Sequence, residues 1–453
     1  MTVQGIFVDG GFVLLGGVLM KFDKVNTVIQ GHDAVRVPKM VKIRQKFETA
    51  TVEDPVAELK KLLLANVPQT VIKSLPGKSI AVSASSRGIP FHKELLKAMA
   101  DQLKIWGASP FIFPAMGSHA GGTAESQKQF LEEYGITEEY VGVPIKSSME
   151  VVEISRLDDG LIIYCDKHAA EADGIVVLNK IKPHTHLKAR HESGLLKMIC
   201  IGIGKHQGAA TFHSKSFDEF EEYLVAVSRA FMKAKNVIFG VGVTQNAYDL
   251  IGKIDVFPAE KIIEGDAAML ALAKEQMARL KLDAIDVLII DEIGKDISGV
   301  GFDTNVSGRI EVISQQAAFR AIAPDIKKIV LLDITEHSHG NASGMGEADL
   351  ISYRFVNKID FGSTYTNIIT NKYLKAAAMP IYGNSDLDVI KTAILTSIHA
   401  DLDNPRIVRI KNTLMLEEIE VSTAYLEEIG KRKDIEILSE PYEWMFNSED
   451  NLW

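Results

Sequence analysis

The feature that most constrains the fold of this chain is a repeated alternation of short apolar segments with longer amphipathic ones. Residues 78–83, 110–114 and 174–178 are apolar runs of strand length, whereas residues 91–106 and 123–134 carry apolar side chains at helical spacing. Such an alternation predicts strand–helix units and a parallel sheet.

The alternation resumes in the second half of the chain. Strands, a helix and a further strand are expected at residues 285–290, 328–332, 386–400 and 406–410. A chain of 453 residues is longer than one hydrophobic core usually holds. We therefore predict two α/β domains with mostly parallel sheets, residues 1–282 and 283–453, and an active-site cleft between them.

Composition limits the partners and the compartment. The net charge of −10 argues against nonspecific nucleic-acid binding, which needs basic patches to displace counterions. The two cysteines, Cys165 and Cys200, stand in apolar surroundings, so no disulfide framework is expected and a cytoplasmic location is favoured. Residues 1–20 lack the basic start of a signal peptide and are too interrupted to span a membrane, and we expect strands or a loose hairpin there.

The residues best suited to catalysis or ligand binding are concentrated between Asn179 and His213. This segment holds five of the twelve histidines. It follows an apolar strand, and Pro183 ends regular pairing, so His184 and His186 should project from a loop. Polar residues at the carboxyl end of a parallel strand usually face a crevice.

Lys197 stands inside a segment, residues 194–203, that is otherwise apolar and that Ser193 could cap as a helix. A lysine in such a setting is costly unless it extends its amine to the surface, is paired, or is used chemically. Taken alone, an amine reaching the surface from the edge of the core is the simpler interpretation.

Several familiar motifs are not supported. The sequence GIGK at residues 202–205 lacks the upstream glycine of a phosphate loop and the following Ser or Thr. There is no HExxH and no CxxC, so zinc-protease and zinc-finger sites are not indicated. A generic divalent-metal site remains open, with the candidate ligands His184, His186, His191, His206 and His213.

Two loops that follow the first strands carry further candidates. Arg87 lies just beyond one predicted strand, and His119 lies in a glycine-rich loop before a helix. In isolation, Arg87 could be a surface charge and His119 a loop or capping residue. Both loops lie at the carboxyl edge of the sheet that also delivers His184, so we expect them to converge on one crevice.

The segments PHTHL, ESGLLKM, IGK and FH resemble the core of the nickel-dependent lactate racemase superfamily. The resemblance implies a nickel-pincer nucleotide, a pyridinium mononucleotide whose thioamide and thiocarboxylate arms grip nickel. By the same resemblance His184 would be a catalytic base, Lys197 would be linked to the cofactor through the thioamide, and His213 would be a nickel ligand.

The resemblance extends beyond this block. Arg87 is similar to an arginine that binds the substrate carboxylate, His119 to the second catalytic base, and Lys295 to a substrate-contacting lysine of the second domain. Ala84 departs from the pattern, because the family has aspartate three residues before its arginine. The Pro-His-to-Lys spacing is a few residues longer than in lactate racemase, so His186 is an alternative to His184, which is preferred because it follows proline.

The resemblance implies an isomerase that racemises or epimerises a small 2-hydroxy acid by hydride transfer. The substrate could be lactate or a larger acid. Alternatives are a non-catalytic nickel-nucleotide-binding protein and a divalent-metal-dependent hydrolase. No nucleic-acid or membrane partner is expected. The sequence leaves open the oligomeric state and the roles of His337 and His339.

Overall fold

The computed structural model describes residues 6–8, 11–13, 22–86, 88–212 and 214–452. The chain divides into two compact units. One comprises Met1–Lys46, Leu280–Glu311 and Phe319–Trp453, and the other comprises Phe47–Arg279 and Val312–Ala318. The chain passes from one unit to the other between Arg279 and Leu280, and the first 46 residues belong with the C-terminal half of the chain.

The Phe47–Arg279 unit is built on a five-stranded sheet, which is parallel except at one edge. Its strands, in spatial order, are β10 (Ile251–Pro258), β9 (Val237–Gln245), β8 (Gly174–Lys180), β4 (Ser79–Ala84) and β5 (Ser109–Pro114). The strands predicted at residues 78–83, 110–114 and 174–178 are confirmed.

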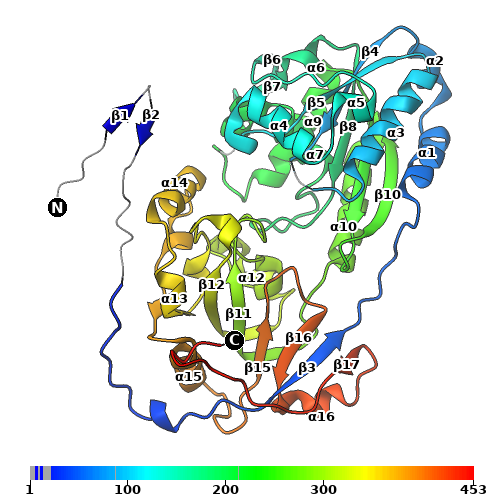
Figure 1. Cartoon of the computed structure of the whole chain (residues 1–453). Coiled ribbons are helices and arrows are strands. Elements are labelled where there is room, and N and C mark those ends of the chain that lie inside the picture. Colours follow the sequence, from blue (N-terminus) through cyan, green and yellow to red (C-terminus); the bar gives the residue numbers. More distant parts are fainter. Residues whose placement is uncertain (1–5, 9–10, 14–21, 87, 213, 453) are drawn as a thin grey trace. The chain divides into compact units, whose positions relative to one another are not determined.

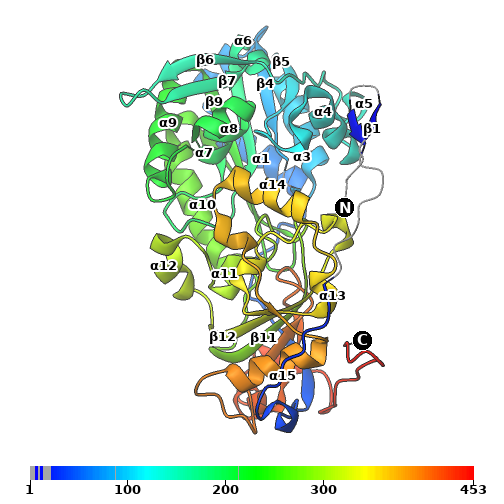
Figure 2. The same ribbon diagram turned by 90° about the vertical axis from the view of Figure 1, so that its left-hand side faces the viewer.

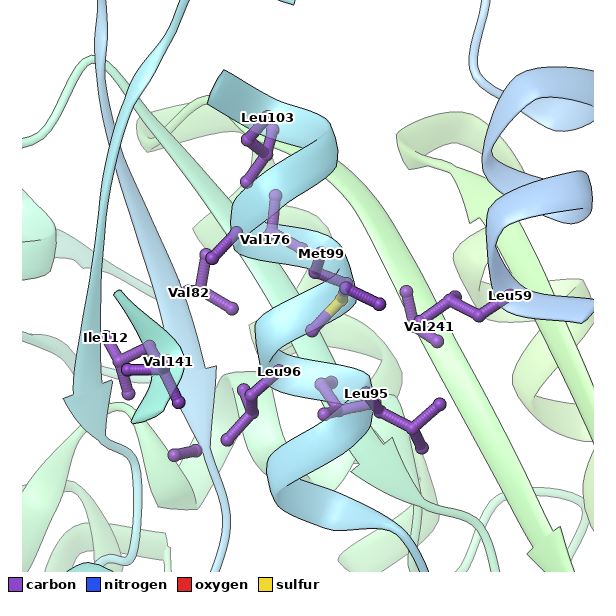
Figure 3. Close-up of a cluster of buried hydrophobic side chains, with 14 of the residues drawn as sticks. Leu59, Val82, Leu95, Leu96, Met99, Leu103, Ile112, Val141, Val176 and Val241 are labelled. Atoms are coloured by element: carbon purple, nitrogen blue, oxygen red, sulfur yellow. The ribbon is translucent and has the colours of Figure 1, made fainter. Parts of the chain in front are cut away.

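Both faces of this sheet are buried, as expected for parallel strands covered by helices. Along β4 and β8, Val82 and Val176 belong to one core cluster, whereas their neighbours Ala81 and Val177 belong to the other. The first face is covered by α1 (Pro55–Asn66) and α3 (His92–Ile105). Figure 3 shows this cluster, with Leu59, Leu95, Leu96, Met99 and Leu103 on the helices and Val82, Val176 and Val241 on the strands.

The opposite face is covered by α7 (Leu195–Lys197), α9 (Phe220–Ala234) and α10 (Ile262–Gln276). The buried side of α9 carries Phe220, Leu224, Val227 and Phe231. The other named elements of this unit are α2 (Gln69–Ser74), α4 (Ala124–Glu133), α5 (Glu138–Val141), β6 (Val151–Arg156), β7 (Ile162–Asp166), α6 (Lys167–Glu171) and α8 (Lys205–Phe212).

Local sequence explains where these helices begin and end. Asp54 caps α1 by accepting from the backbone N–H groups of Val56 and Ala57, and Pro55 occupies the first turn, where its missing N–H costs nothing. Helix α1 ends at Asn66, because Pro68 cannot continue it, and a short α2 follows.

The other unit contains an eight-stranded mixed sheet (Figure 1). Its order is β14 (Ile381–Tyr382), β13 (Leu350–Ile351), β12 (Asp325–Ile334), β11 (Ala284–Ile293), β15 (Ile407–Ile410), β16 (Glu418–Ser422), β3 (Met40–Gln45) and β17 (Ile435–Ile437). The first five are parallel and the last three pair antiparallel. Helix α15 (Asp386–Thr396) packs its apolar side on β11 and β12, as Figure 2 also shows.

Strand β3 explains why the N-terminal residues belong to this unit, since it lies between β16 and β17 and pairs with both. The C-terminal residues contribute β16 and β17 to the same sheet. The remaining named elements are β1 (Ile6–Val8), β2 (Gly11–Val13), α11 (Thr304–Ser307), α12 (Gln316–Arg320), α13 (Tyr353–Val356), α14 (Phe361–Asn371) and α16 (Leu426–Ile429). Across the described part of the chain, no helix has the length and apolar character needed to cross a membrane.

Candidate active site

The strand order of the five-stranded sheet creates a switch point between β4 and β8. From β4 the chain proceeds to β5 on one side, and the next strand of the sheet, β8, lies on the other side. Ligands of such sheets bind beyond the carboxyl ends of the strands at this point. Lys180, at the end of β8, donates from Nζ to the carbonyl oxygen of Gly88 in the loop after β4, at 2.9 Å. The two loops are therefore tied together where a ligand is expected.

The loop after β8 is organised by Glu192, whose side chain is buried. Its Oε2 accepts from the backbone N–H of His184 at 2.7 Å, and its Oε1 accepts from that of Ala189 at 3.0 Å. Lys188 and Lys274 form ion pairs with the same carboxylate at 3.3 and 2.6 Å. A single buried acid thus closes the loop on itself and is neutralised from two sides.

The imidazole of His184 is fixed in one tautomer. Its Nδ1 lies 3.0 Å from the backbone nitrogen of His186, and a backbone N–H can only donate. Nδ1 is therefore the acceptor, and the neutral ring carries its hydrogen on Nε2. Burial and, next, the Lys197 ammonium hold the pKa of His184 well below its ordinary value. His184 is consequently neutral near pH 7.

Aromatic rings pack beside the two histidines of this loop. The ring of His186 stacks on Phe217 with centroids 5.3 Å apart, and His184 contacts Phe217 and Phe220 at 5.9 and 6.1 Å. Both imidazoles are therefore packed against Phe217, which precedes α9, and His184 also against Phe220, the first residue of that helix. His184 and His186 are both half-buried, so geometry alone leaves either able to face a ligand.

Lys197 lies on a tightly anchored turn. The carboxylate of Asp266 accepts from the backbone N–H of Leu195 at 2.5 Å, and Asn179 donates to the carbonyl of Gly194 at 2.7 Å. A Cβ on Gly194 would lie 2.1 Å from Oδ1 of Asp266, so only glycine fits. The expected cap, Ser193, does not cap this helix; its carbonyl instead accepts from Lys182 N–H at 2.8 Å.

The segment that follows Lys197 departs from regular helix. Residues Met198–Gly202 form a π-helical turn, a feature often found at functional sites. The predicted helix over residues 194–203 is therefore present as one short turn and this wider one. Lys197 is half-buried, and its ammonium is close enough to lower the pKa of His184. The structure thus brings these two predicted residues together.

His119 lies in the loop after β5 and is exposed. Its Nδ1 is 2.6 Å from the hydroxyl of Ser86 in the loop after β4, so the loops of adjacent strands are linked here as well. A hydroxyl can donate or accept, and either tautomer of His119 satisfies this contact. If Ser86 accepts from Nδ1–H, then Nε2 of His119 is a proton acceptor.

Three other predicted site residues are not part of this described cluster. Arg87 and His213 lie outside the described residues. Lys295 belongs to the other unit, where its Nζ donates to the carbonyl of Gly299 at 2.6 Å and its backbone N–H to Ser338 at 2.8 Å. His337 and His339 are exposed in that unit.

Several residues that support the site were not predicted to do so. Glu192 was visible as the acid within the histidine-rich segment, but its buried role was not. Lys180 could have been predicted as a site residue, because it lies at the carboxyl end of a parallel strand. Asp266 gave no sequence signal, because it lies 71 positions from the backbone group it binds.

Within the described residues, no group of three or more His, Cys, Asp or Glu side chains is arranged to hold a metal ion. His191, one of the candidate ligands, is buried and lies 3.4 Å from Asp266 through Nδ1, while His206 is exposed on α8. The described part of the chain therefore does not support a metal site made by protein ligands alone.

Part of the chain is similar to a known protein family. Residues 33–223 match the family description of the lactate racemase N-terminal domain. The lactate racemase apoprotein of Thermoanaerobacterium thermosaccharolyticum has a similar structure, with a TM-score of 0.53 at 15% sequence identity, covering 87% of this chain and 97% of that chain. A protein from Thermotoga maritima matches with a TM-score of 0.42 at 14% identity, covering 61% of this chain and 69% of that one. No curated protein matches the sequence.

The chain therefore shares the fold of lactate racemase, and the histidine-rich segment lies inside the region, residues 33–223, that matches the lactate racemase N-terminal domain.

Proposed function

We propose that this protein is an isomerase that racemises or epimerises a 2-hydroxy acid with the help of a nickel-pincer nucleotide. The observation that carries the proposal is the pairing of a neutral His184 with the nearby Lys197 at the switch point of the sheet, inside a lactate racemase N-terminal domain. The isomerase activity, the cofactor and the substrate class are all parts of this proposal.

The chemistry explains why such a set of residues is needed. The Cα hydrogen of a 2-hydroxy acid is too weakly acidic for a side-chain base at neutral pH, so removing it as hydride avoids a carbanion. When bound, the nickel-pincer nucleotide supplies the hydride acceptor. The protein must then hold the substrate and move the hydroxyl proton.

The residues present fit the cofactor in two respects. Lys197 is half-buried on a turn that Asp266 and Asn179 hold in place, which suits a covalent attachment point. His184 beside it is neutral, as a group that exchanges protons with a hydroxyl must be. Lys197 would hold the nucleotide, and His213 would be the protein ligand to nickel.

Proton movement is assigned to His119 and His184. In the present arrangement His184 offers a hydrogen at Nε2, and His119 offers an acceptor at Nε2 when Ser86 accepts from its Nδ1. For His184 to act as a base at Nε2, its hydrogen must move to Nδ1, and this requires release of the His186 amide. The two histidines thus begin in different states.

The substrate carboxylate is assigned to Arg87, whose planar guanidinium can make a two-point contact, and to Lys295. Lys295 would first have to leave the carbonyl of Gly299. Ala84 ends β4 fully buried and offers no polar group where the family has aspartate. We therefore propose a 2-hydroxy acid as the substrate, and a larger acid such as a sugar acid is as good a candidate as lactate.

The test is interconversion of enantiomers. Protein produced together with the cofactor-biosynthesis enzymes is incubated with single enantiomers or epimers of 2-hydroxy acids deuterated at Cα, and products are separated on a chiral column. The expected result is the opposite configuration at C2 with the deuterium retained, because hydride returns to the same carbon. Loss of deuterium to solvent would point to proton abstraction, and cofactor binding without conversion of any acid would favour a non-catalytic nickel-nucleotide-binding protein.

A further inference from the structure

The lysine of the GIGK sequence has an unexpected setting. Lys205 is fully buried and begins α8 with a φ of +54°, a left-handed conformation that residues with a side chain rarely adopt. Strained backbone of this kind persists only where surrounding contacts fix it. The lysine of a phosphate loop binds a ligand's phosphates, so that role does not explain why Lys205 is buried and strained.

The ammonium of Lys205 lies close to three oxygen atoms, of which two accept hydrogen bonds and one forms an ion pair. It donates to the carbonyl of Pro114, lies 3.3 Å from Oε1 of Gln127, and forms an ion pair at 3.2 Å with Oδ2 of Asp166. Asp166 is fully buried as well. Burial lowers the pKa of Lys205 and raises that of Asp166, and the charge of each partner opposes this effect on the other. The pair remains inside the core because each compensates the other.

Gln127 connects the ammonium of Lys205 to the loop that carries His119. Because an ammonium can only donate, the side-chain oxygen of Gln127 must face Lys205, and its NH₂ group must face away. That group donates to the carbonyls of Gly117 and His119, at 3.1 and 3.2 Å. Gln127 is itself fully buried on α4. The backbone of the His119 loop is thus held from within the protein.

The same contacts reach the turn that follows Lys197. The backbone N–H of Gly117 donates to the carbonyl of Gly202 at 3.1 Å, and that of Asp166 donates to the carbonyl of Ile203 at 2.9 Å. Gly117 has a φ of +58°, and a Cβ there would lie 3.6 Å from Ile201. The loop carrying His119 and the π-helical turn after Lys197 therefore share one set of buried contacts.

We propose that Asp166, Lys205 and Gln127 form a positioning network that sets the place of His119 relative to Lys197. The three residues act through the loop and do not touch the substrate. The proposal rests on the proposed function only in giving His119 a part in proton transfer; the positioning itself can be measured without cofactor or substrate.

The test is Gln127→Glu, with Gln129→Glu as the matched control. The new carboxylate at position 127 still accepts from Lys205, but it cannot donate to the carbonyls of Gly117 and His119 and repels them. Gln129 lies on the same helix, is exposed, and donates to Glu133 at 3.2 Å, so its replacement should leave the loop unchanged. Gln127→Met, which lacks donor and acceptor, serves as a second variant of similar size.

The cofactor-free proteins are compared by backbone amide exchange and by the imidazole signals of ¹⁵N-histidine-labelled protein. We expect faster exchange confined to residues 115–122 and a displaced His119 signal in both variants at position 127, with no change in Gln129→Glu. An unchanged His119 signal and loop in both variants, or failure of both to fold, would overturn the proposal, because the network would then be structural only.

An activity measurement separates this proposal from the proposed function. In the cofactor-loaded protein, Gln127→Glu should lower kcat by roughly tenfold to a hundredfold with little change in KM, since a small misplacement of a reacting group has effects of this size. If the wild-type protein interconverts no 2-hydroxy acid, the proposed function fails while the amide-exchange and imidazole results still decide the positioning role. Equal losses of activity in Gln127→Glu and Gln129→Glu would contradict positioning through Gln127.

Discussion

At the scale of single residues, the site depends on charges that are held close to His184. The pKa of this imidazole is lowered first by burial and then by Lys197, with smaller effects from His186, Lys188 and Lys182. A thioamide nitrogen carries no positive charge, so attachment of a cofactor at Lys197 would remove the strongest of the charge effects. Under the proposed function, cofactor loading and the proton state of His184 would therefore be linked.

This link can be measured without cofactor. Lys197→Met removes the ammonium and should raise the pKa of His184, because the positive charge disfavours the imidazolium. Lys182→Met, which removes the weakest of these charges, should raise it less. The measurement is an NMR titration of labelled histidine in the three proteins. An unchanged or lower His184 pKa in Lys197→Met would show that the two side chains do not interact.

Glu192 provides a second prediction at this scale. Glu192→Ala leaves Lys188, Lys274 and two backbone N–H groups without their shared acceptor. Breaking a buried pair from one side is strongly destabilising, and the side chains of Lys188 and Lys274 are 10% and 35% exposed, so we expect a loss of about 3 kcal/mol of unfolding free energy. Urea unfolding measures it, with the exposed Glu132→Ala as control. Equal stabilities of the two variants would contradict the organising role of Glu192.

At the scale of elements, the sequence identifies strands well and helix anchors poorly. The buried runs that became β4, β5 and β8 were recognisable because apolar residues on both faces of a parallel strand leave a short continuous run. The anchor of α7 was not recognisable. Ser193 stood in the right place for a cap, but Asp266 from α10 binds the first N–H instead. Contacts between distant elements leave no local pattern in the sequence.

Gly194→Ala tests this anchor. The added methyl group would overlap Oδ1 of Asp266 and displace it from Leu195 N–H, so we expect a loss of roughly 2 kcal/mol of unfolding free energy, as for the loss of a helix cap with some added strain. Gly88→Ala is the control, since the nearest atom to its new Cβ would be 3.8 Å away. Denaturant unfolding gives both values. No difference between the two variants would contradict the steric argument.

At the scale of the whole molecule, the fold class followed from the alternation of elements, and the division of the chain did not. The predicted boundary at residue 282 was based on strand–helix alternation, which restarts there. The pairing of β3 could not be predicted, because a six-residue strand carries little information about partners that lie more than 370 positions away in the chain. The candidate site was predicted by resemblance at His119, His184 and Lys197, whereas the buried acids and amides that hold these residues required the structure.

The pairing of β3 predicts how fragments behave. Residues 280–453 alone lack the strand between β16 and β17, so we expect this fragment to be partly unfolded. Joining residues 22–46 to it through a flexible linker should restore a cooperative thermal transition. Circular dichroism during heating is the measurement. A cooperative transition of the same midpoint in both fragments would show that β3 is dispensable.

The most direct test of the proposed site is the identity of the residue that carries the cofactor. The protein is produced with the cofactor-biosynthesis enzymes, and its intact mass and peptide map are compared with those of Lys197→Ala and Lys205→Ala. We predict a nickel-pincer adduct on Lys197 that is absent from Lys197→Ala. The adduct should be present in any folded Lys205→Ala protein, because Lys205 is fully buried in an ion pair and cannot carry the cofactor. An adduct on another lysine, or none on protein from a host that loads a known lactate racemase, would contradict it.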